Sequence, residues 1–424
     1  PVTERLVGLI YGLVNREYLW IARLLTTTFW LIGGIFLFKV AARIVSPEAA
    51  IFSTAYYLFV PLGVLASRSF QPDPLMIMMF LFGLFTIVQY YDQPSMIRLV
   101  IAASISGFAI LIKPLVLFAL LGAFVSLAIY RKGSQNRVID GQLLIFTVVC
   151  LLPTVLYYGY GMFITDSLKS QAQGSFLPQL LLSQEYWKDW SLTAAGTVGY
   201  KALLAGLVGL PMLRKGMPRA LLIGLWSGYI IFGLVFTNHI RFVNYYHLQL
   251  IVIVALSFAP IAALVMNNLK QATNPWYWWL PVAGAFLLAF LFSIREVRSQ
   301  QLAIYRTLER VETAQEIGKI VGHSSKNVYL ASHYGMPLEY YGELTGTYWP
   351  RRLSDPQRAL GLADEYGASV EERLRSLGFS PEYFIITQFD QLNRYHPDLK
   401  EYLVKNCPLL TESDEYLIYG ACTK

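Results

Sequence analysis

Asp73 lies in a short polar segment between two strongly apolar stretches, where a membrane helix is expected to begin. It is one of only nine acidic residues among the first 294. Because Asp followed by Pro is a good start for a helix, one interpretation is an interfacial residue that caps the helix beginning at Pro74. The other interpretation is a carboxylate held at a membrane-embedded active site, since ionisable residues inside membranes often mark function. The residue type alone leaves both open.

Three basic residues, Arg68, Lys113 and Arg241, stand singly near the ends of apolar stretches. A cation partly withdrawn from water can stabilise negative charge that grows on a leaving phosphate, and a nearby carboxylate can accept a proton. Each of the three could instead be an ordinary interfacial residue that extends its charged end into water. A common location would favour the chemical interpretation.

Polar side chains cluster around Arg241: His239, Asn244, Tyr245 and His247. Together they could shape a polar pocket for a ligand. The two histidines are too sparse to indicate a metal site, and ordinary interfacial hydrogen bonding is the alternative to ligand binding.

The composition places these residues in a membrane protein. Of the 424 residues, 55% are hydrophobic and 15% aromatic, too many to bury in soluble cores. The net charge of +7 is uneven, because residues 1–294 hold 19 Lys and Arg against 9 Asp and Glu, whereas residues 295–424 hold 15 against 18. The positive excess therefore indicates membrane topology rather than nucleic-acid binding.

Ten apolar runs are expected to span the membrane. They lie at about 19–43, 47–66, 74–91, 96–112, 114–130, 140–160, 196–213, 218–236, 244–267 and 275–294. The run from 96 to 130 is too long for one span, and Lys113-Pro114 is its natural break. Residues 1–18 are amphipathic and predict a helix lying on the membrane surface.

Charge in the loops predicts the orientation of these spans. Alternate loops carry most of the positive charge, at Lys39 and Arg43, Arg98, Arg131, Lys132 and Arg137, Arg214, Lys215 and Arg219, and Lys270. Those loops are expected to be cytoplasmic. Asp73, Lys113, Arg241 and the C-terminal region are then expected on the outer face.

Residues 295–424 predict a small extracytoplasmic α/β domain that follows a transmembrane domain of residues 1–294. A polar helix is expected at 296–321, strands at 328–331, 383–386 and 416–419, and helices at 369–377 and 398–406. Cys407 and Cys422 could pair in an oxidising compartment or stay reduced in the core. His333, Tyr334, Tyr340 and Tyr341 stand near strand ends, where loops often bind ligands.

The segment 161–195 is expected to be a long outer loop that carries aromatic and polar residues: Tyr186, Trp187, Lys188, Asp189 and Trp190. It could form a lid or an acceptor surface. An aromatic belt at the membrane interface is the favoured alternative.

Several short motifs in the first 130 residues resemble the membrane half of the GT-C glycosyltransferases, closest to the branch of protein O-mannosyltransferases and the lipid A aminoarabinose transferase. A later segment resembles the family's Arg-Tyr segment at the start of a late helix. The motifs are Arg23-Leu24-Leu25, Tyr57, Pro61, Arg68, Pro72-Asp73-Pro74, Gly107 to Pro114, and Arg241 to Tyr246.

The resemblance implies an inverting enzyme that moves a sugar from a polyprenyl-phosphate donor to a lipid, glycan or protein acceptor on the outer face of a bacterial or archaeal cell membrane. It makes Asp73 the second-loop carboxylate, Lys113 a cation that faces the phosphate, and Arg241 a further one, with Arg68 beside them. Nucleic acid is not an expected partner, and no cofactor is implied with certainty. Participation of a divalent metal stays open.

One departure from the family leaves alternatives. The family's principal acidic motif lies in the first external loop, before the segment matched at Pro1, and the chain has no counterpart. We expect the chain, which starts without Met, to be a fragment whose upstream part holds that motif. Otherwise it would be a noncatalytic GT-C-like subunit of a membrane assembly. A lipid or solute transporter is a further alternative from another class, although transporters more often show two matching halves.

Overall fold

The computed structural model describes residues 2–132, 141–165, 168, 176–272, 277, 279–305, 308–349 and 369–422. The chain divides into two compact units, Pro1–Val297 and Arg298–Lys424.

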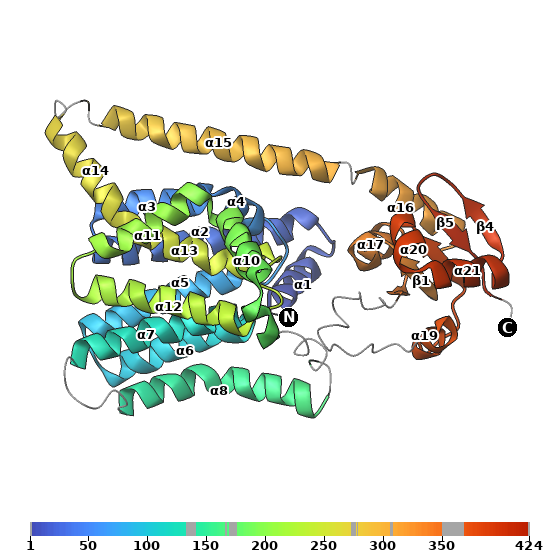
Figure 1. Cartoon of the computed structure of the whole chain (residues 1–424), viewed down its shortest axis with the longest axis horizontal. Coiled ribbons are helices and arrows are strands. Elements are labelled where there is room, and N and C mark those ends of the chain that lie inside the picture. Colours follow the sequence, from blue (N-terminus) through green and yellow to red (C-terminus); the bar gives the residue numbers. More distant parts are fainter. Residues whose placement is uncertain are drawn as a thin grey trace. The chain divides into compact units, whose positions relative to one another are not determined.

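The first unit is entirely helical where it is described (Figure 1). Its α-helices are α1 (Val2–Val14), α2 (Leu19–Ile44), α3 (Pro47–Phe59), α4 (Pro61–Ser67), α5 (Asp73–Asp92), α6 (Met96–Ile112), α7 (Leu117–Lys132), α8 (Gly141–Phe163), α10 (Gln184–Val198), α11 (Tyr200–Met212), α12 (Met217–Val235), α13 (Leu248–Ser257), α14 (Ala259–Ala272) and α15 (Trp279–Tyr305). Short 3-10 helices are η1 (Pro114–Val116), η2 (Pro178–Leu182) and η3 (Asn244–His247).

Where the structure describes them, the predicted apolar runs lie largely on helices. Within the described residues, seven helices are long and apolar enough to cross a membrane, and two bent helix pairs could bring the number to nine. Helix α6 is apolar but shorter. The helical membrane architecture is therefore confirmed, and the number of ten spans stays a prediction.

The breaks between helices follow from local chemistry. Lys113 adopts an extended conformation (φ −160°, ψ 123°) because the following Pro114 disfavours helical geometry at the preceding residue, and α6 ends there as predicted. Val60 is likewise extended before Pro61, where the chain bends by 66°. The sharper bend of 94° between α10 and α11 falls at Gly199, whose φ of +83° is easily reached only without a side chain.

Helix α5 packs against α2, α6 and α7, and most of its residues are buried. Helices α7 and α12 lie side by side at glycines. A Cβ atom on Gly224 or Gly228 of α12 would collide with the backbone of α7 at Gly122 or Phe118. Small residues let the two backbones approach closely, as is common where helices pack in membranes.

The second unit contains a five-stranded mixed sheet in the order β2-β1-β3-β5-β4. Strands β2, β1 and β3 are parallel, whereas β5 is antiparallel to both β3 and β4. The strands are β1 (Asn327–Leu330), β2 (Gly346–Tyr348), β3 (Tyr383–Ile386), β4 (Leu409–Glu412) and β5 (Leu417–Tyr419). The helices are α16 (Leu308–Ile320), η4 (Ser332–Gly335), α17 (Met336–Tyr341), α19 (Val370–Ser376), α20 (Phe389–Tyr395) and α21 (Pro397–Asn406).

The sequence located the three most buried strands and the helices α19 and α21, but it missed β2 and β4. These two edge strands have three or four partly exposed residues and no clear apolar pattern. The start at residue 296 of the polar helix expected at 296–321 is also wrong, because α15 runs from Trp279 to Tyr305 without a break there, and α16 covers Leu308–Ile320.

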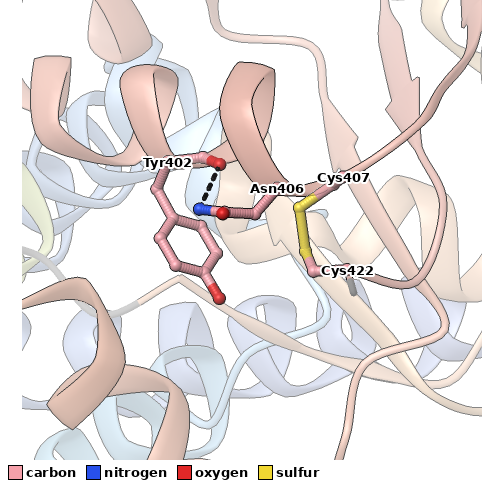
Figure 2. Close-up of a disulfide and its surroundings, with 4 residues drawn as sticks. All are labelled: Tyr402, Asn406, Cys407 and Cys422. Carbon is pink, nitrogen blue, oxygen red and sulfur yellow. Dashed lines mark hydrogen bonds between the residues drawn. A yellow bond between two sulfur atoms is a disulfide. The ribbon is translucent and has the colours of Figure 1, made fainter. Parts of the chain in front are cut away.

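Cys407 and Cys422 form a disulfide that ties the end of α21 to the segment after β5 (Figure 2). The side chain of Asn406 donates a hydrogen bond of 3.0 Å to the carbonyl of Tyr402 beside it. Of the two states that the sequence left open for these cysteines, the structure has the paired one. The third cysteine, Cys150, is buried in α8 and free.

Candidate active site

Asp73 and Lys113 form an ion pair at one end of the helical unit. The Lys113 ammonium donates to both carboxylate oxygens of Asp73, at 2.8 and 2.9 Å. The Asp73 side chain is only 4% exposed, whereas that of Lys113 is 21% exposed. The pair is therefore open to a ligand on the lysine side and closed on the carboxylate side.

Local sequence explains how two residues forty positions apart come together. Helix α5 begins at Asp73, and α6 runs back beside it and ends at Ile112, so both residues lie at the same end of a helix hairpin. Pro72 occupies the N-cap position of α5, and no side chain caps the helix. The interpretation of Asp73 as a helix cap is therefore wrong, because its carboxylate binds Lys113. Its place in the first turn also suits the positive end of the helix dipole.

Tyr245 brings a third segment to this pair. The Lys113 ammonium lies 4.1 Å from the centre of the Tyr245 ring, which is 47% exposed and belongs to η3. A cation over an aromatic face gains attraction without neutralising its charge. The arrangement leaves Lys113 cationic between a carboxylate and a ring, with part of its surface accessible.

Arg241 lies in the loop before η3, and α10 holds it. Its guanidinium is 3.8 Å from the Asp189 carboxylate and lies over the Phe242 ring. The Thr193 hydroxyl, one turn further along α10, donates to the Arg241 carbonyl. The Arg241 side chain is 12% exposed, so a second partly buried cation stands in the segment that also carries Tyr245.

A chain of buried hydrogen bonds also holds the loop that carries Arg241. Trp190 donates to the Tyr229 hydroxyl at 3.0 Å, and that hydroxyl lies 2.7 Å from Nδ1 of His247. Nε2 of His247 lies 2.8 Å from the carbonyl of Ile240. A carbonyl only accepts, so Nε2 carries the proton and Nδ1 of the neutral ring accepts from Tyr229. His247 is fully buried. Its side chain therefore positions the loop and is not accessible to a ligand.

The remaining predicted pocket residues differ in accessibility. His239 is half-buried and stacks on Tyr246, with ring centres 5.5 Å apart. Burial lowers the pKa of His239. Asn244 is exposed at the start of η3. Arg68 is exposed at the end of α4 and forms no ion pair with any residue that the structure describes.

The segment 161–195 differs from the predicted loop. Part of it lies outside the described residues, but residues from Gln184 onward form α10. Trp187 and Trp190 stack on this helix with ring centres 5.6 Å apart, and Tyr186 is buried, donating to the carbonyl of Gly233. The prediction of an open loop is wrong here because the aromatic residues recur at helical spacing and pack against α12.

Sequence reasoning missed the pairing of Asp189 with Arg241 and the role of Tyr229. Asp189 stands among aromatic residues in the sequence, yet it is one of the few acidic residues in this unit. That rarity could have indicated a cation as its partner. Tyr229 lies in an apolar run with no local signal.

Asp73, Lys113 and Tyr245 thus bring together a buried carboxylate, a cation and an aromatic ring, which suits recognition of an anion and transfer of a proton. Arg241 adds a second cation four residues before Tyr245 in the chain, held by its own partner Asp189. In the described part of the chain, no group of three or more His, Cys, Asp or Glu side chains could hold a metal ion.

Comparisons with known proteins agree with this architecture. Residues 1–158 match the profile of a family described as dolichyl-phosphate-mannose-protein mannosyltransferase. No curated protein matches the chain significantly.

Solved structures with a similar fold include ArnT from Cupriavidus metallidurans bound to undecaprenyl phosphate, with a TM-score of 0.53, 15% identity, and coverage of 96% of this chain and 85% of that one. The apo state of the same protein gives a TM-score of 0.54 at 15% identity, covering 99% and 87%. The oligosaccharyltransferase from Archaeoglobus fulgidus in complex with Zn and sulfate gives 0.52 at 12% identity, covering 95% and 61%. These likenesses confirm the predicted fold class.

Proposed function

We propose that this chain, which has the fold of the GT-C membrane glycosyltransferases, transfers a sugar from a polyprenyl-phosphate donor to an acceptor on the outer face of the membrane, with inversion. The observation that carries the proposal is the buried Asp73–Lys113 pair beneath Tyr245. Burying a carboxylate in a membrane protein is costly, so such a pair usually serves a function.

Lys113 is the proposed contact for the donor phosphate. An ammonium has three donors, and two of its contacts here are with Asp73. The remaining donor and the exposed part of the side chain are available to a phosphate oxygen. As the bond between the sugar and the phosphate breaks, negative charge grows on that phosphate, and Lys113 stabilises it.

Asp73 is the proposed base. Lys113 covers the enclosed carboxylate, so its shift toward the leaving phosphate weakens the ion pair and opens Asp73 to the acceptor from the lysine side. The carboxylate can then accept the proton of the acceptor group as that group forms the new bond to the sugar. Loss of the phosphate and deprotonation of the acceptor assist each other. Lys113 moves toward the negative charge that forms on the phosphate, and this movement frees Asp73 to act as the base.

Arg241 and Arg68 are proposed as further phosphate contacts, with His239, Asn244 and Tyr245 lining the pocket. Arg241 is held by Asp189 at 3.8 Å, a distance long enough for a ligand to compete. An arginine can bind two phosphate oxygens in parallel, which would fix the orientation of the donor. His247 takes the positioning role that its buried hydrogen bonds support.

Ion pairs support the predicted grouping of these residues at two opposite ends of the helices. Among the described residues of the helical unit, Arg43–Asp92 and Lys270–Glu48 join residues at the end predicted to be cytoplasmic. The pairs formed by Asp73 and by Arg241 lie at the end predicted to be outside. Asp73 and Asp92 bound α5, whose 20 residues span about 30 Å, roughly the hydrocarbon thickness.

Two further observations favour a lipid-phosphate donor and an oxidising compartment for the C-terminal unit. A similar structure holds undecaprenyl phosphate, a polyprenyl phosphate. The Cys407–Cys422 disulfide is of a kind that persists outside the cytoplasm. The sugar, the polyprenol and the acceptor are left to experiment.

The test is sugar transfer by full-length protein from defined polyprenyl-phosphate donors, comparing wild type with Asp73→Asn and Lys113→Ala. We expect transfer from at least one donor, and a loss of about 10²- to 10³-fold in each variant. Asp92→Asn is the matched control, because Asp92 is also paired with a cation, Arg43, but at the other end of α5.

Unchanged turnover in Asp73→Asn and Lys113→Ala would remove both residues from the proposed site. Inactivity of the wild type on every donor would favour a noncatalytic subunit. Donor-independent movement of lipid or solute across vesicles would favour the transporter.

A further inference from the structure

The C-terminal unit has a cavity of its own, about 290 Å³ in volume. It lies at the carboxyl ends of the parallel strands β1 and β3, where Ser332 follows β1 and Thr387 and Gln388 follow β3. The backbone amides of Thr387 and Gln388 both donate to the carbonyl of Leu330, which fixes the two loops against each other. The cavity is therefore part of the sheet's framework.

The strand order places this cavity where ligands bind in many α/β sheets. From β1 the chain passes to β2 on one side of the sheet, whereas after β3 it builds β4 and β5 on the other side. Loops that leave neighbouring parallel strands in opposite directions leave a crevice between them, and such switch points are common ligand sites. A volume of about 290 Å³ is near the lower end of the range for small-molecule pockets.

The polar groups that line the cavity indicate the chemistry of the ligand. They are hydroxyls on Thr313, Ser332 and Thr387, the amide of Gln388, and carboxylates on Asp414 and Glu415, which lie in the turn between β4 and β5. The Thr313 hydroxyl donates to the Glu415 carboxylate. The lining described by the structure contains no Lys or Arg, which disfavours a phosphate or another anion. Hydroxyls, amides and carboxylates are the groups that bind a ligand rich in hydroxyls.

Two of these polar side chains are free to bind. Within the described residues, the side chains of Thr387 and Gln388 have no hydrogen-bond partner, although each is partly buried. A ligand that supplies hydrogen-bond partners to such partly buried side chains is bound more tightly. The ring of Phe389, the next residue, gives the cavity an apolar wall.

An adjoining hollow of about 270 Å³ shares Ser332 and Gln388 with the cavity and adds aromatic surface. Tyr334 and Tyr348 meet there edge to face, with ring centres 5.4 Å apart, and the Tyr348 hydroxyl donates to Gln391 at 3.1 Å. Tyr334 is 66% exposed on a backbone with φ of +58°, a left-handed conformation that is uncommon for a tyrosine. Strain of this kind is found at ligand sites more often than elsewhere.

We propose that this cavity and the adjoining hollow form a saccharide-binding site in the C-terminal unit, distinct from the site at Asp73. A sugar ring presents hydroxyls to the Gln388 and Thr387 side chains and an apolar face to the Tyr334 ring. The proposal goes beyond sugar transfer, since it would hold even if the helical unit had no catalytic activity.

Saturation-transfer difference NMR on the full chain tests the proposal, with mannose, glucose, galactose and N-acetylglucosamine as separate probes. The protein is kept in a detergent without a sugar head group, because such a head group would compete. We expect saturation transfer to at least one of the four sugars. The Gln388→Leu variant, which keeps the bulk and removes the amide, should bind that sugar about tenfold more weakly. Tyr334→Ala should weaken it roughly three- to tenfold.

Two control variants locate the binding. Tyr395→Ala removes another exposed tyrosine of the same unit, on α20, and should leave the signal unchanged. Asp73→Asn should also leave it unchanged. Absence of saturation transfer from all four sugars would overturn the proposal. So would signals that survive both Gln388→Leu and Tyr334→Ala, or that disappear in Asp73→Asn, because the sugar would then bind elsewhere.

Discussion

Removing Lys113 should be more damaging to stability than removing Asp73, because the two partners are buried to different extents. At a separation of 2.8 Å and an effective dielectric constant of about 20, the attraction is roughly 6 kcal/mol before desolvation is subtracted. Deleting one partner of a buried pair typically costs about 3–5 kcal/mol, since the other charge is left unpaired. Lys113→Met strands a carboxylate that is 4% exposed, whereas Asp73→Asn leaves an ammonium that is 21% exposed.

We therefore expect Lys113→Met to lower the free energy of unfolding by about 3–5 kcal/mol, and Asp73→Asn to lower it by less. The double variant should recover much of the loss, because a neutral pair leaves no buried charge. The assay is denaturant titration in mixed micelles. The exposed Arg43–Asp92 pair is the control, and Asp92→Asn should cost under about 1 kcal/mol. Equal costs for the two single variants, or no recovery in the double variant, would refute the reasoning.

Three further outcomes follow from the packing and the buried polar groups. Gly224→Ala places a methyl group against the backbone of α7 and should lower the thermal midpoint by an amount equivalent to about 1–3 kcal/mol. The control Gly284→Ala, whose methyl group meets nothing within 4 Å, should leave the midpoint unchanged. Equal midpoints for the two variants would contradict the close approach of the helices. Tyr229→Phe removes the hydroxyl that donates to His247, so the loop of Arg241 and Tyr245 is positioned less firmly. The KM for the lipid-linked sugar should rise more than kcat falls. A loss in kcat alone would argue against a positioning role for Tyr229. Burial lowers the pKa of His239, so below about pH 6.5 this residue binds more protons in the unfolded chain than in the folded protein. The stability that it contributes is therefore present above that pH and lost as the pH falls. Melting of wild type and His239→Gln at pH 7.5 and 5.5 should show the larger drop in the wild type, and parallel drops would count against it.

The positions of the apolar helices and the common location of Asp73 and Lys113 could be predicted from the sequence, because both depend on local signals. Apolar length sets the helices, and Lys113-Pro114 sets the break in the run from 96 to 130. Alternation of loops across the membrane then brings Asp73 and Lys113 to one side. Those rules act over single spans, which is why they succeeded without tertiary information.

The partners of these charges could not be predicted in the same way. Which cation binds Asp73 depends on how α5 and α6 pack, and the pairing of Asp189 with Arg241 depends on α10 being a helix. His247 looked like a pocket residue because of its polarity, yet the fold buries it between Tyr229 and Ile240. Tertiary packing decides such contacts, and no spacing in the sequence reports it.

In the C-terminal unit, strand propensity identified β1, β3 and β5, whose residues are mostly buried. Strands β2 and β4 lie at the two edges of the described sheet and are partly exposed, so they carry no comparable apolar signal. Pairing of Cys407 with Cys422 also required the fold, since spacing alone allows either state.

The central claim is that Asp73 and Lys113 act as one unit in sugar transfer. It is tested most directly by a double-mutant cycle on kcat with Asp73→Asn, Lys113→Ala and the double variant, assayed with a polyprenyl-phosphate donor that the wild type uses. Residues that act together are not additive, so the double variant should be no slower than the slower single variant. Losses that multiply across the two sites would show that the carboxylate and the ammonium work independently and would contradict the account.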